Sequence, residues 1–367
     1  MNAALKRISE LLLQKGVAFV NYSLPGSSEN SLIISFSPQK HMSLDFLRTI
    51  NQSGFVIAPF NANTHSPIWF MDAAKIIDEK SNLISLENKL NSLPDAVEQS
   101  EKKLNSTSKA EYEKAFLTFK NHLDSTKLDK IILSRIVSVE NNKVSPIDFY
   151  GQLLEAYPNA FTYFLQLPNR EIWIGASPEL LFKQDENGIH TMALAGTQSI
   201  NSRKLEEIRW ESKEIQEQAY VKEYILEIFE SGLANIVSSE TYTSQAGKLA
   251  HLRTDISVNQ FVERSKCIDI IKQLHPTPAV CGIPLEESRK LILETERHER
   301  KYYTGFLGLV DTDSLSLFVN LRCMQFNNHQ FALYVGGGIT RNSEMEKEWD
   351  ETQAKANTLI SILNRLK

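Results

Sequence analysis

The stretch GFLGLVDTDSLSLFVNLRCMQFNNHQFALYVGG, residues 305–337, decides the fold class of this chain. It holds three short apolar runs, GFLGLVD, LSLFVNLRC and FALYVGG, which are separated by polar residues and therefore predict consecutive strands. Residues 346–359 are free of proline and glycine and rich in good helix formers. They predict a terminal helix with a buried apolar stripe.

Further strand-like runs lie upstream. DKIILSRIVSV, AFTYFLQLP, EIWIGAS, ELLFKQD and IHTMALAG follow one another, and helical periodicity predicts helices at residues 109–124, 203–231 and around 256–273. Residues 81–110 are polar and indicate a surface connection with marginal helix. Strands in runs, then helices, then strands again predict an α+β fold with large antiparallel sheets rather than a doubly wound nucleotide fold. The glycine cluster in YVGGGIT matches neither dinucleotide nor P-loop spacing.

The composition is that of a globular chain with enough apolar material for a large core. Hydrophobic residues make up 42% of the 367 residues, and the formal net charge of -5 argues against a broad basic surface for nucleic acid. No apolar run approaches the roughly 20 residues that cross a bilayer, and the N-terminal stretch is a poor secretion signal. The three cysteines are odd in number and widely spaced, so a disulfide framework is not expected. We therefore predict a cytoplasmic protein.

Two residues in the strand runs are candidates for proton transfer. Lys130 opens the run KIILSR, where it either reaches back to water or is desolvated, in which case burial lowers the pKa of its amine and lets it act as a base. Glu179 follows a tight break in GASPELL, where it is either a solvated turn residue or a buried acid kept protonated. Linear sequence alone does not show that the two face each other.

Carboxylates on two predicted helices could bind a cation. Glu211, Glu214 and Glu217 recur every three residues, which is usual for a solvated face, but Glu217 borders the apolar residues of its helix. Glu348 and Glu351 flank the apolar stripe of the terminal helix. A magnesium ion needs only one or two protein carboxylates, so Glu217 and Glu351 would suffice if the helices converge.

Arginine and glycine in the last strands indicate an anion site. Arg322 lies in VNLRC, where an internal ion pair or a substrate carboxylate could satisfy it. Gly336 begins a run of flexible amides able to approach an anion. The proline-rich loop LHPTPAVCGIP is neither helix nor central strand, so it could line a pocket, whereas His275 and His251 are more typical of structural histidines than of metal ligands. Together these features indicate a magnesium-dependent enzyme acting on a small carboxylate.

The motifs KIILSR, GASPEL, LAGT, KEIQEQ, HPTPAVCGIP, ERKYYTGFLG, VNLRC, GGGI and EWDETQAK occur in this order. As a set the chain resembles the chorismate-utilising enzymes over about residues 110–365, and HPTPAVCGIP is most similar to the isochorismate synthase branch. The resemblance implies a single large α+β domain, with two antiparallel sheets flanked by helices. Residues 1–108 would be the variable N-terminal part of the same fold, and residues 109–367 the chorismate-binding catalytic region.

The resemblance also implies roles for individual residues. Lys130 would be the base that activates water for attack at C2 of chorismate, and Glu179 the acid that protonates the departing C4 hydroxyl. Mg²⁺ would be held by Glu217 and Glu351 with Glu348 beside them. The substrate-binding positions would be Gly196, His251, Ala279, Tyr303, Arg322, Gly336 and Lys355. One departure is Gln218, where the family often has histidine.

Other activities within the resemblance stay open. A salicylate synthase would share the base, acid and metal and then eliminate pyruvate. An anthranilate or aminodeoxychorismate synthase component would use ammonia and a glutaminase partner, against which Lys130 argues. A non-catalytic interaction protein would use the EWDETQAK face as a surface. We expect a monomer that needs no glutaminase subunit and acts in either menaquinone or siderophore synthesis.

Overall fold

The computed structural model describes residues 1–73, 75–77, 83–97, 103–141, 143–200, 204–247, 249–327 and 329–366. Within them two antiparallel sheets are stacked, which confirms the predicted α+β class. The first has nine strands in the order β15 (Gly282–Ile283), β7 (Lys130–Glu140), β19 (Gln330–Ile339), β18 (Cys323–Asn327), β9 (Ile172–Ser177), β8 (Phe161–Gln166), β1 (Ala18–Ser23), β2 (Ser31–Ser35) and β6 (Lys75–Ile77).

The second sheet has ten strands in the order β12 (Ile236–Ser238), β14 (Leu249–Val258), β11 (Gly188–Ser199), β10 (Leu180–Asp185), β17 (Leu315–Val319), β16 (Phe306–Val310), β4 (Gly54–Ala58), β5 (Ile68–Asp72) and β3 (Gln39–His41). Strand β13 (Tyr242–Ala246) also pairs with β14. The N-terminal residues therefore supply strands to both sheets. The core between the sheets is aromatic, and Phe161 stacks on Phe318 with ring centres 4.5 Å apart.

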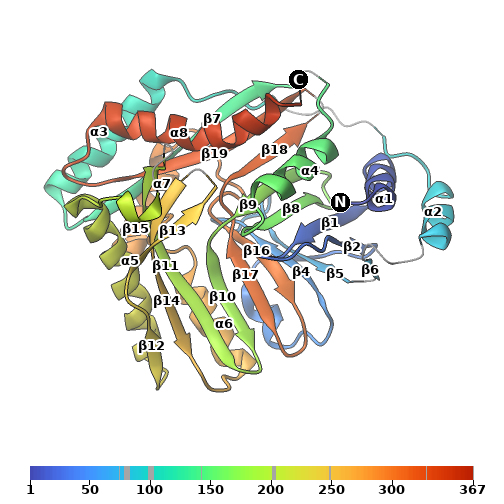
Figure 1. Ribbon diagram of the computed structural model, residues 1–367, viewed down its shortest axis with the longest axis horizontal. Helices are drawn as coiled ribbons and strands as arrows, with labels where there is room; N and C mark the ends of the chain where they lie inside the picture. Colours follow the sequence, from blue (N-terminus) through green and yellow to red (C-terminus); the bar gives the residue numbers. More distant parts are fainter. Residues whose placement is uncertain are drawn as a thin grey trace.

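Helices cover the outer faces of both sheets (Figure 1). They are α1 (Ala3–Lys15), α2 (Ile84–Asn91), α3 (Lys109–Ser125), α4 (Pro146–Ala156), α5 (Ser212–Glu230), α6 (Arg264–Leu274), α7 (Leu285–Thr295) and α8 (Met345–Leu363). Helix α8 lies along β19, and α5 lies along β11. These two helices bring the acids of KEIQEQ and EWDETQAK to the same end of the sheets. No helix in the described ranges is both long enough and apolar enough to span a bilayer.

Two predicted helix boundaries are wrong. The helix expected at 203–231 begins only at Ser212, because Glu211 and Glu214 form a capping box that fixes its start; residues 201–203 lie outside the described part. The helix expected around 256–273 begins at Arg264. Residues 249–258 instead form a strand, and alternate burial from Thr254 to Val258 shows the two-residue period of a sheet.

Candidate active site

A partly open cavity of about 120 Å³ lies where β7 and β19 of the first sheet approach β11 and β14 of the second. Most of the substrate and catalytic residues predicted from the sequence line it: Glu179, Gly196, Glu217, His251, Ala279, Tyr303, Arg322, Gly336 and Lys355. They come from strands, loops and helices far apart in the chain. The cavity is therefore the candidate active site.

Lys130 is fully buried, so the interpretation of a lysine reaching back to water is wrong. It is the first residue of β7 and is not among the residues that line the cavity, whereas Ile132 and Glu217, the ion-pair partner of Lys130, are. Its Nζ lies 2.7 Å from Glu217 Oε1, held by charge rather than by a well-aligned hydrogen bond. Burial alone would raise the pKa of Glu217, but Lys130, aided by Lys355 and Lys213, lowers it overall.

Glu179 lies in the break between β9 and β10 and is only 3% exposed. Its amide contacts Ser177 Oγ at 3.3 Å, and its carbonyl accepts from the amide of Val319 at 3.0 Å, so both neighbours fix the turn. Burial raises the pKa of the Glu179 carboxyl to about 8, although the charge of Lys130 acts in the opposite direction. A carboxyl in this position is protonated at neutral pH and can donate a proton.

The three predicted metal carboxylates each contact a lysine. Glu217 pairs with Lys130, Glu348 Oε1 lies 2.6 Å from Lys213 Nζ, and Glu351 Oε1 lies 2.7 Å from Lys355 Nζ. In the described ranges no three acidic, histidine or cysteine side chains are already grouped as metal ligands. The lysines thus balance the charge of the acids in this conformation.

The three acids nevertheless lie next to two consecutive glycines of β19. A methyl group at Gly337 would lie 3.6 Å from Glu348 Oε2 and 3.8 Å from Glu351 Oε1, and one at Gly338 would lie 2.8 Å from Glu217 Oε1. Glu348 Oε2 is buried and has no hydrogen-bond partner among the described residues. Burial, the leading cause, raises the pKa of Glu348. A buried carboxylate oxygen without a partner is a donor that a hard cation such as Mg²⁺ can use.

Arg322 and His251 form the polar end of the cavity. Arg322 Nη2 donates to His251 Nε2 at 2.7 Å and Nη1 donates to the carbonyl of Ala246 at 3.0 Å. Because guanidinium can only donate, His251 carries its proton on Nδ1, which donates to the carbonyl of Gly196 at 2.8 Å. Burial and then the charge of Arg322 lower the pKa of His251 to about 3, so its ring is neutral.

Arg322 has no carboxylate partner at ion-pair distance in the described part of the chain, which removes the alternative of an internal ion pair. Its left-handed backbone (φ 47°) and its place at the start of β18 set the guanidinium at the cavity wall. The half-buried guanidinium donates to neutral groups and still carries a full charge, so an anionic ligand would be a suitable partner for it.

Glycine at 336 is required by close packing. A methyl group there would lie 2.9 Å from Tyr303 Oη, and the carbonyl of Gly336 accepts from Lys355 Nζ at 3.0 Å. The loop His275–Cys281 places Ala279 and Val280 in the lining, and its Cys281 carbonyl accepts from the amide of Ile132 at 2.8 Å. His275, by contrast, bonds the carbonyl of Pro59 and does not line the cavity.

Some site residues were not predicted. Lys213 contacts Glu348 from α5, and its four-residue spacing from Glu217 on one helix face was the signal that could have identified it. Thr197 and Tyr334 also line the cavity. No sequence pattern singles out either one. Glu211 and Glu214 cap α5 and do not line the cavity, so only Glu217 of that predicted acidic stripe reaches it.

The cavity and its surroundings form a candidate site for a small anionic molecule, with a buried acid and an arginine in its lining and the buried Lys130 amine in contact with Glu217. The sequence profile described as chorismate binding enzyme matches residues 9–364. The chain belongs to this family.

Among curated relatives, the vibriobactin-specific isochorismate synthase of Vibrio cholerae is 27% identical over 324 residues, which cover 84% of this chain and 78% of that protein. Isochorismate synthase MenF of Haemophilus influenzae is 26% identical over 247 residues, covering 65% of this chain and 57% of that protein. The second match thus spans little more than half of the relative's length.

Solved structures share the fold. The menaquinone-specific isochorismate synthase MenF from Escherichia coli superposes with a TM-score of 0.78 at 21% identity, covering 99% of this chain and 91% of that one. Anthranilate synthase component I from Streptococcus pneumoniae superposes with a TM-score of 0.70 at 18% identity, covering 93% and 92%. At these identities the superpositions establish the architecture alone.

Proposed function

We propose that this protein is an isochorismate synthase, an isomerase that converts chorismate reversibly to isochorismate with Mg²⁺. The observation that carries the proposal is a cavity lined by buried Glu179, Glu217 and Arg322, with the buried amine of Lys130 in contact with Glu217 behind that lining. Family membership supports chorismate as the ligand, and the names of the curated relatives support isochorismate as the product.

In the proposed reaction one water molecule is added and one is released. Lys130, as the free amine, takes a proton from the water that bonds to C2. Glu179 gives its proton to the C4 hydroxyl, whose bond to carbon breaks while the ring double bonds shift. The elevated pKa of Glu179 suits this role, because an acid must hold its proton until the leaving group needs it.

Both ends of the dianionic substrate have partners in the cavity. Arg322, with neutral His251 behind it and the Gly336 amide nearby, would bind the enolpyruvyl carboxylate. Glu217 and Glu351, with Glu348 beside them, would hold Mg²⁺. When bound, the ion would supply positive charge to the ring carboxylate of the substrate. It would also offset the negative charge of Glu217. Gly196, Ala279, Tyr303 and Lys355 would shape the space between these ends. Fixing both ends orients the ring between base and acid.

Product analysis tests this proposal. Purified protein, chorismate and Mg²⁺ should give isochorismate, without salicylate or pyruvate. Salicylate with an equal amount of pyruvate would instead assign a salicylate synthase, and turnover only with ammonia would assign an anthranilate-type enzyme. Either product requires a different account of the same cavity.

We also propose that the protein acts as a cytoplasmic monomer without a glutaminase subunit. The three cysteines are unpaired and buried, which suits a reducing compartment. Both menaquinone and siderophore synthesis begin from isochorismate and would be served by this activity. Light scattering of the purified chain tests whether it is a monomer. Turnover of that chain with water as the only nucleophile tests whether it acts without a glutaminase subunit.

A further inference from the structure

A second buried ion pair lies behind the wall of the active-site cavity. Glu296 and Arg300 follow α7, and their side chains are 3% and 2% exposed. Arg300 Nη2 donates to Glu296 Oε1 at 2.7 Å and Nε donates to Oε2 at 2.8 Å. The guanidinium also lies 4.5 Å from the ring centre of Phe60. Neither residue of this pair lines the active-site cavity. Arg300 belongs to the motif ERKYYTGFLG, whose pattern did not predict a role for it.

The remaining bonds of Arg300 go to the cavity wall. Nη2 donates to the carbonyl of Ile132 at 2.7 Å and Nη1 donates to that of Val280 at 2.8 Å. Ile132 and Val280 both line the cavity, one on the strand that begins with Lys130 and the other on the proline-rich loop. A single buried side chain thus ties the strand that begins with Lys130 to the neighbouring proline-rich loop, whose Cys281 carbonyl also accepts from the Ile132 amide at 2.8 Å.

The ion pair also provides hydrogen-bond partners for backbone groups at the edge of β7 where no described strand pairs with it. Strand β15 pairs only with Lys130 and Ile131, so the same edge of β7 continues without a strand partner in the described residues. There Arg300 binds the Ile132 carbonyl, and Glu296 Oε1 accepts from the amide of Ser134 at 2.7 Å. Satisfying these backbone groups keeps β7 extended next to the cavity.

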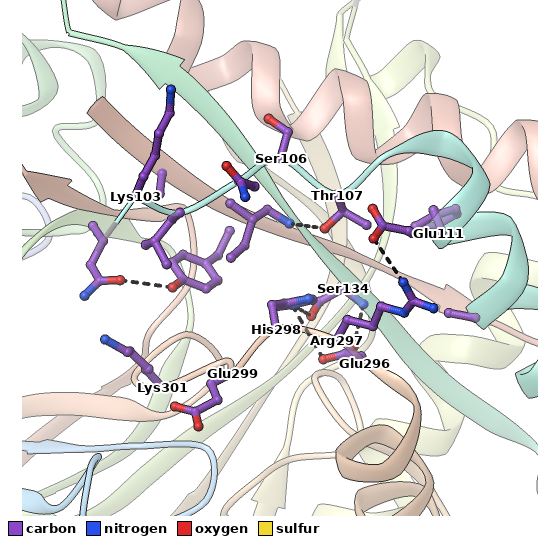
Figure 2. A pocket seen from close by; sticks show the side chains of 18 of the residues that line it. Lys103, Ser106, Thr107, Glu111, Ser134, Glu296, Arg297, His298, Glu299 and Lys301 are labelled. Atoms are coloured by element: carbon purple, nitrogen blue, oxygen red, sulfur yellow. Dashed lines mark hydrogen bonds and ion pairs between the residues drawn. The ribbon is translucent and has the colours of Figure 1, made fainter. Parts of the chain in front are cut away.

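The far side of the pair faces a different cavity, of about 1250 Å³ (Figure 2). Figure 2 shows Ser134, Glu296 and His298 together there, and His298 Nε2 lies 2.9 Å from Ser134 Oγ. The wall of the active-site cavity is therefore backed by solvent-filled space and not by packed core residues. The ion pair is the support between the two cavities.

We propose that Arg300 and Glu296 are positioning residues for the reaction proposed above, on which this inference rests. They hold Ile132 and Val280 at a fixed separation and thereby fix Lys130 relative to the ring. Substrate anchors such as Arg322 and the metal carboxylates do not touch the pair. Loss of the pair should therefore reduce kcat while leaving KM and Mg²⁺ dependence nearly unchanged, since a misplacement of 1 Å costs about a hundredfold in rate.

Arg300→Lys and Glu296→Asp test the inference, because each keeps the buried charge. Arg300→Lys removes the planar guanidinium that makes the two parallel hydrogen bonds, and Glu296→Asp shortens the side chain that accepts them. Lys301→Met is the matched control: Lys301 is the next residue, pairs with Glu171 at 2.8 Å and does not line the active-site cavity. We expect a kcat loss of about tenfold to a hundredfold in both test variants, KM within threefold, and an unfolding temperature close to that of the control.

Hydrogen exchange of the intact protein adds a readout independent of turnover. The Ser134 amide should exchange faster in Glu296→Asp than in Lys301→Met. A kcat within twofold of wild type in the folded variants, or an equal loss in the control, would overturn the positioning role while leaving the proposed activity in place. Absence of chorismate turnover in the wild-type protein would contradict both the proposed activity and the positioning role.

Discussion

Lys130 Nζ lies 2.7 Å from Glu217 Oε1, and the lysine has no exposed surface. The proposed base is therefore held by a carboxylate that is also a proposed metal ligand. A cation bound to Glu217 would therefore compete with Lys130 for the same carboxylate.

Lys130→Ala should reduce kcat by about 10²–10⁴-fold, the usual contribution of a positioned base. Chorismate binding should stay measurable by calorimetry, because Arg322 and the metal carboxylates are untouched. Lys183→Ala, at a half-exposed ion pair with Asp185, is the control and should keep full activity. Near-normal turnover of Lys130→Ala would remove this residue as the base.

Activity should fall at alkaline pH. Since burial raises the pKa of Glu179 to about 8, the carboxyl carries its proton below that pH and loses it above, so kcat/KM should decline as pH rises through about 8. In Glu179→Gln the amide cannot donate a proton in this way. The rate should drop about 10²-fold or more, and the alkaline limb should disappear. An unchanged limb in the variant would assign it to another group.

Glu351→Gln should shift the Mg²⁺ titration of substrate binding at least about tenfold toward higher concentration, because even indirect support of a metal is worth that much. Glu346→Gln is a matched control on the same helix, since Glu346 pairs with Lys109 at an exposed site. Equal titrations for the two variants would place the ion elsewhere.

Arg322→Lys should raise KM by about tenfold or more, equivalent to about 1.4 kcal/mol of lost binding, with a smaller effect on kcat. Lysine cannot donate to His251 and to a carboxylate with the planar fork of arginine. Arg253→Lys, whose side chain pairs with Asp255 away from the cavity, should leave KM unchanged. A selective loss of kcat in Arg322→Lys would contradict its assignment as a substrate anchor.

His251 should stay neutral well below physiological pH. Burial and Arg322 lower the pKa of its ring to about 3, so nitrogen-15 spectra should show the Nδ1-protonated tautomer without titration between pH 5 and 8. Exposed His65 provides the comparison in the same spectra. A midpoint for His251 near its ordinary pKa would contradict the hydrogen-bond assignment.

The sequence predicted the fold class and the family correctly but misplaced some helix boundaries. Strand runs and the EWDETQAK helix were predictable because their patterns are local. The resemblance supplied a set of residues of which most line one cavity, whereas Lys130, Glu348 and Glu351 do not. Strand β14 was mistaken in part for helix, because its extended form depends on pairing with β11 and β13, which a local period cannot reveal.

Long-range pairing also explains what was missed in the site. The burial of Lys130 depends on Glu217 from a distant helix, and the bonds of Arg300 depend on a loop and a strand from two other parts of the chain. Lys213 could have been noted from its spacing to Glu217, but its partner Glu348 could not. Such contacts exist only after the sheets have stacked.

The strands contributed by the N-terminal residues have a practical consequence. Because β1 and β2 lie inside one sheet and β4 and β5 inside the other, a fragment beginning at residue 109 would expose the aromatic interior on two unpaired edges. Expression of such a fragment should give aggregated material. The described residues among the first hundred thus hold both sheets together although they supply none of the side chains that line the active-site cavity.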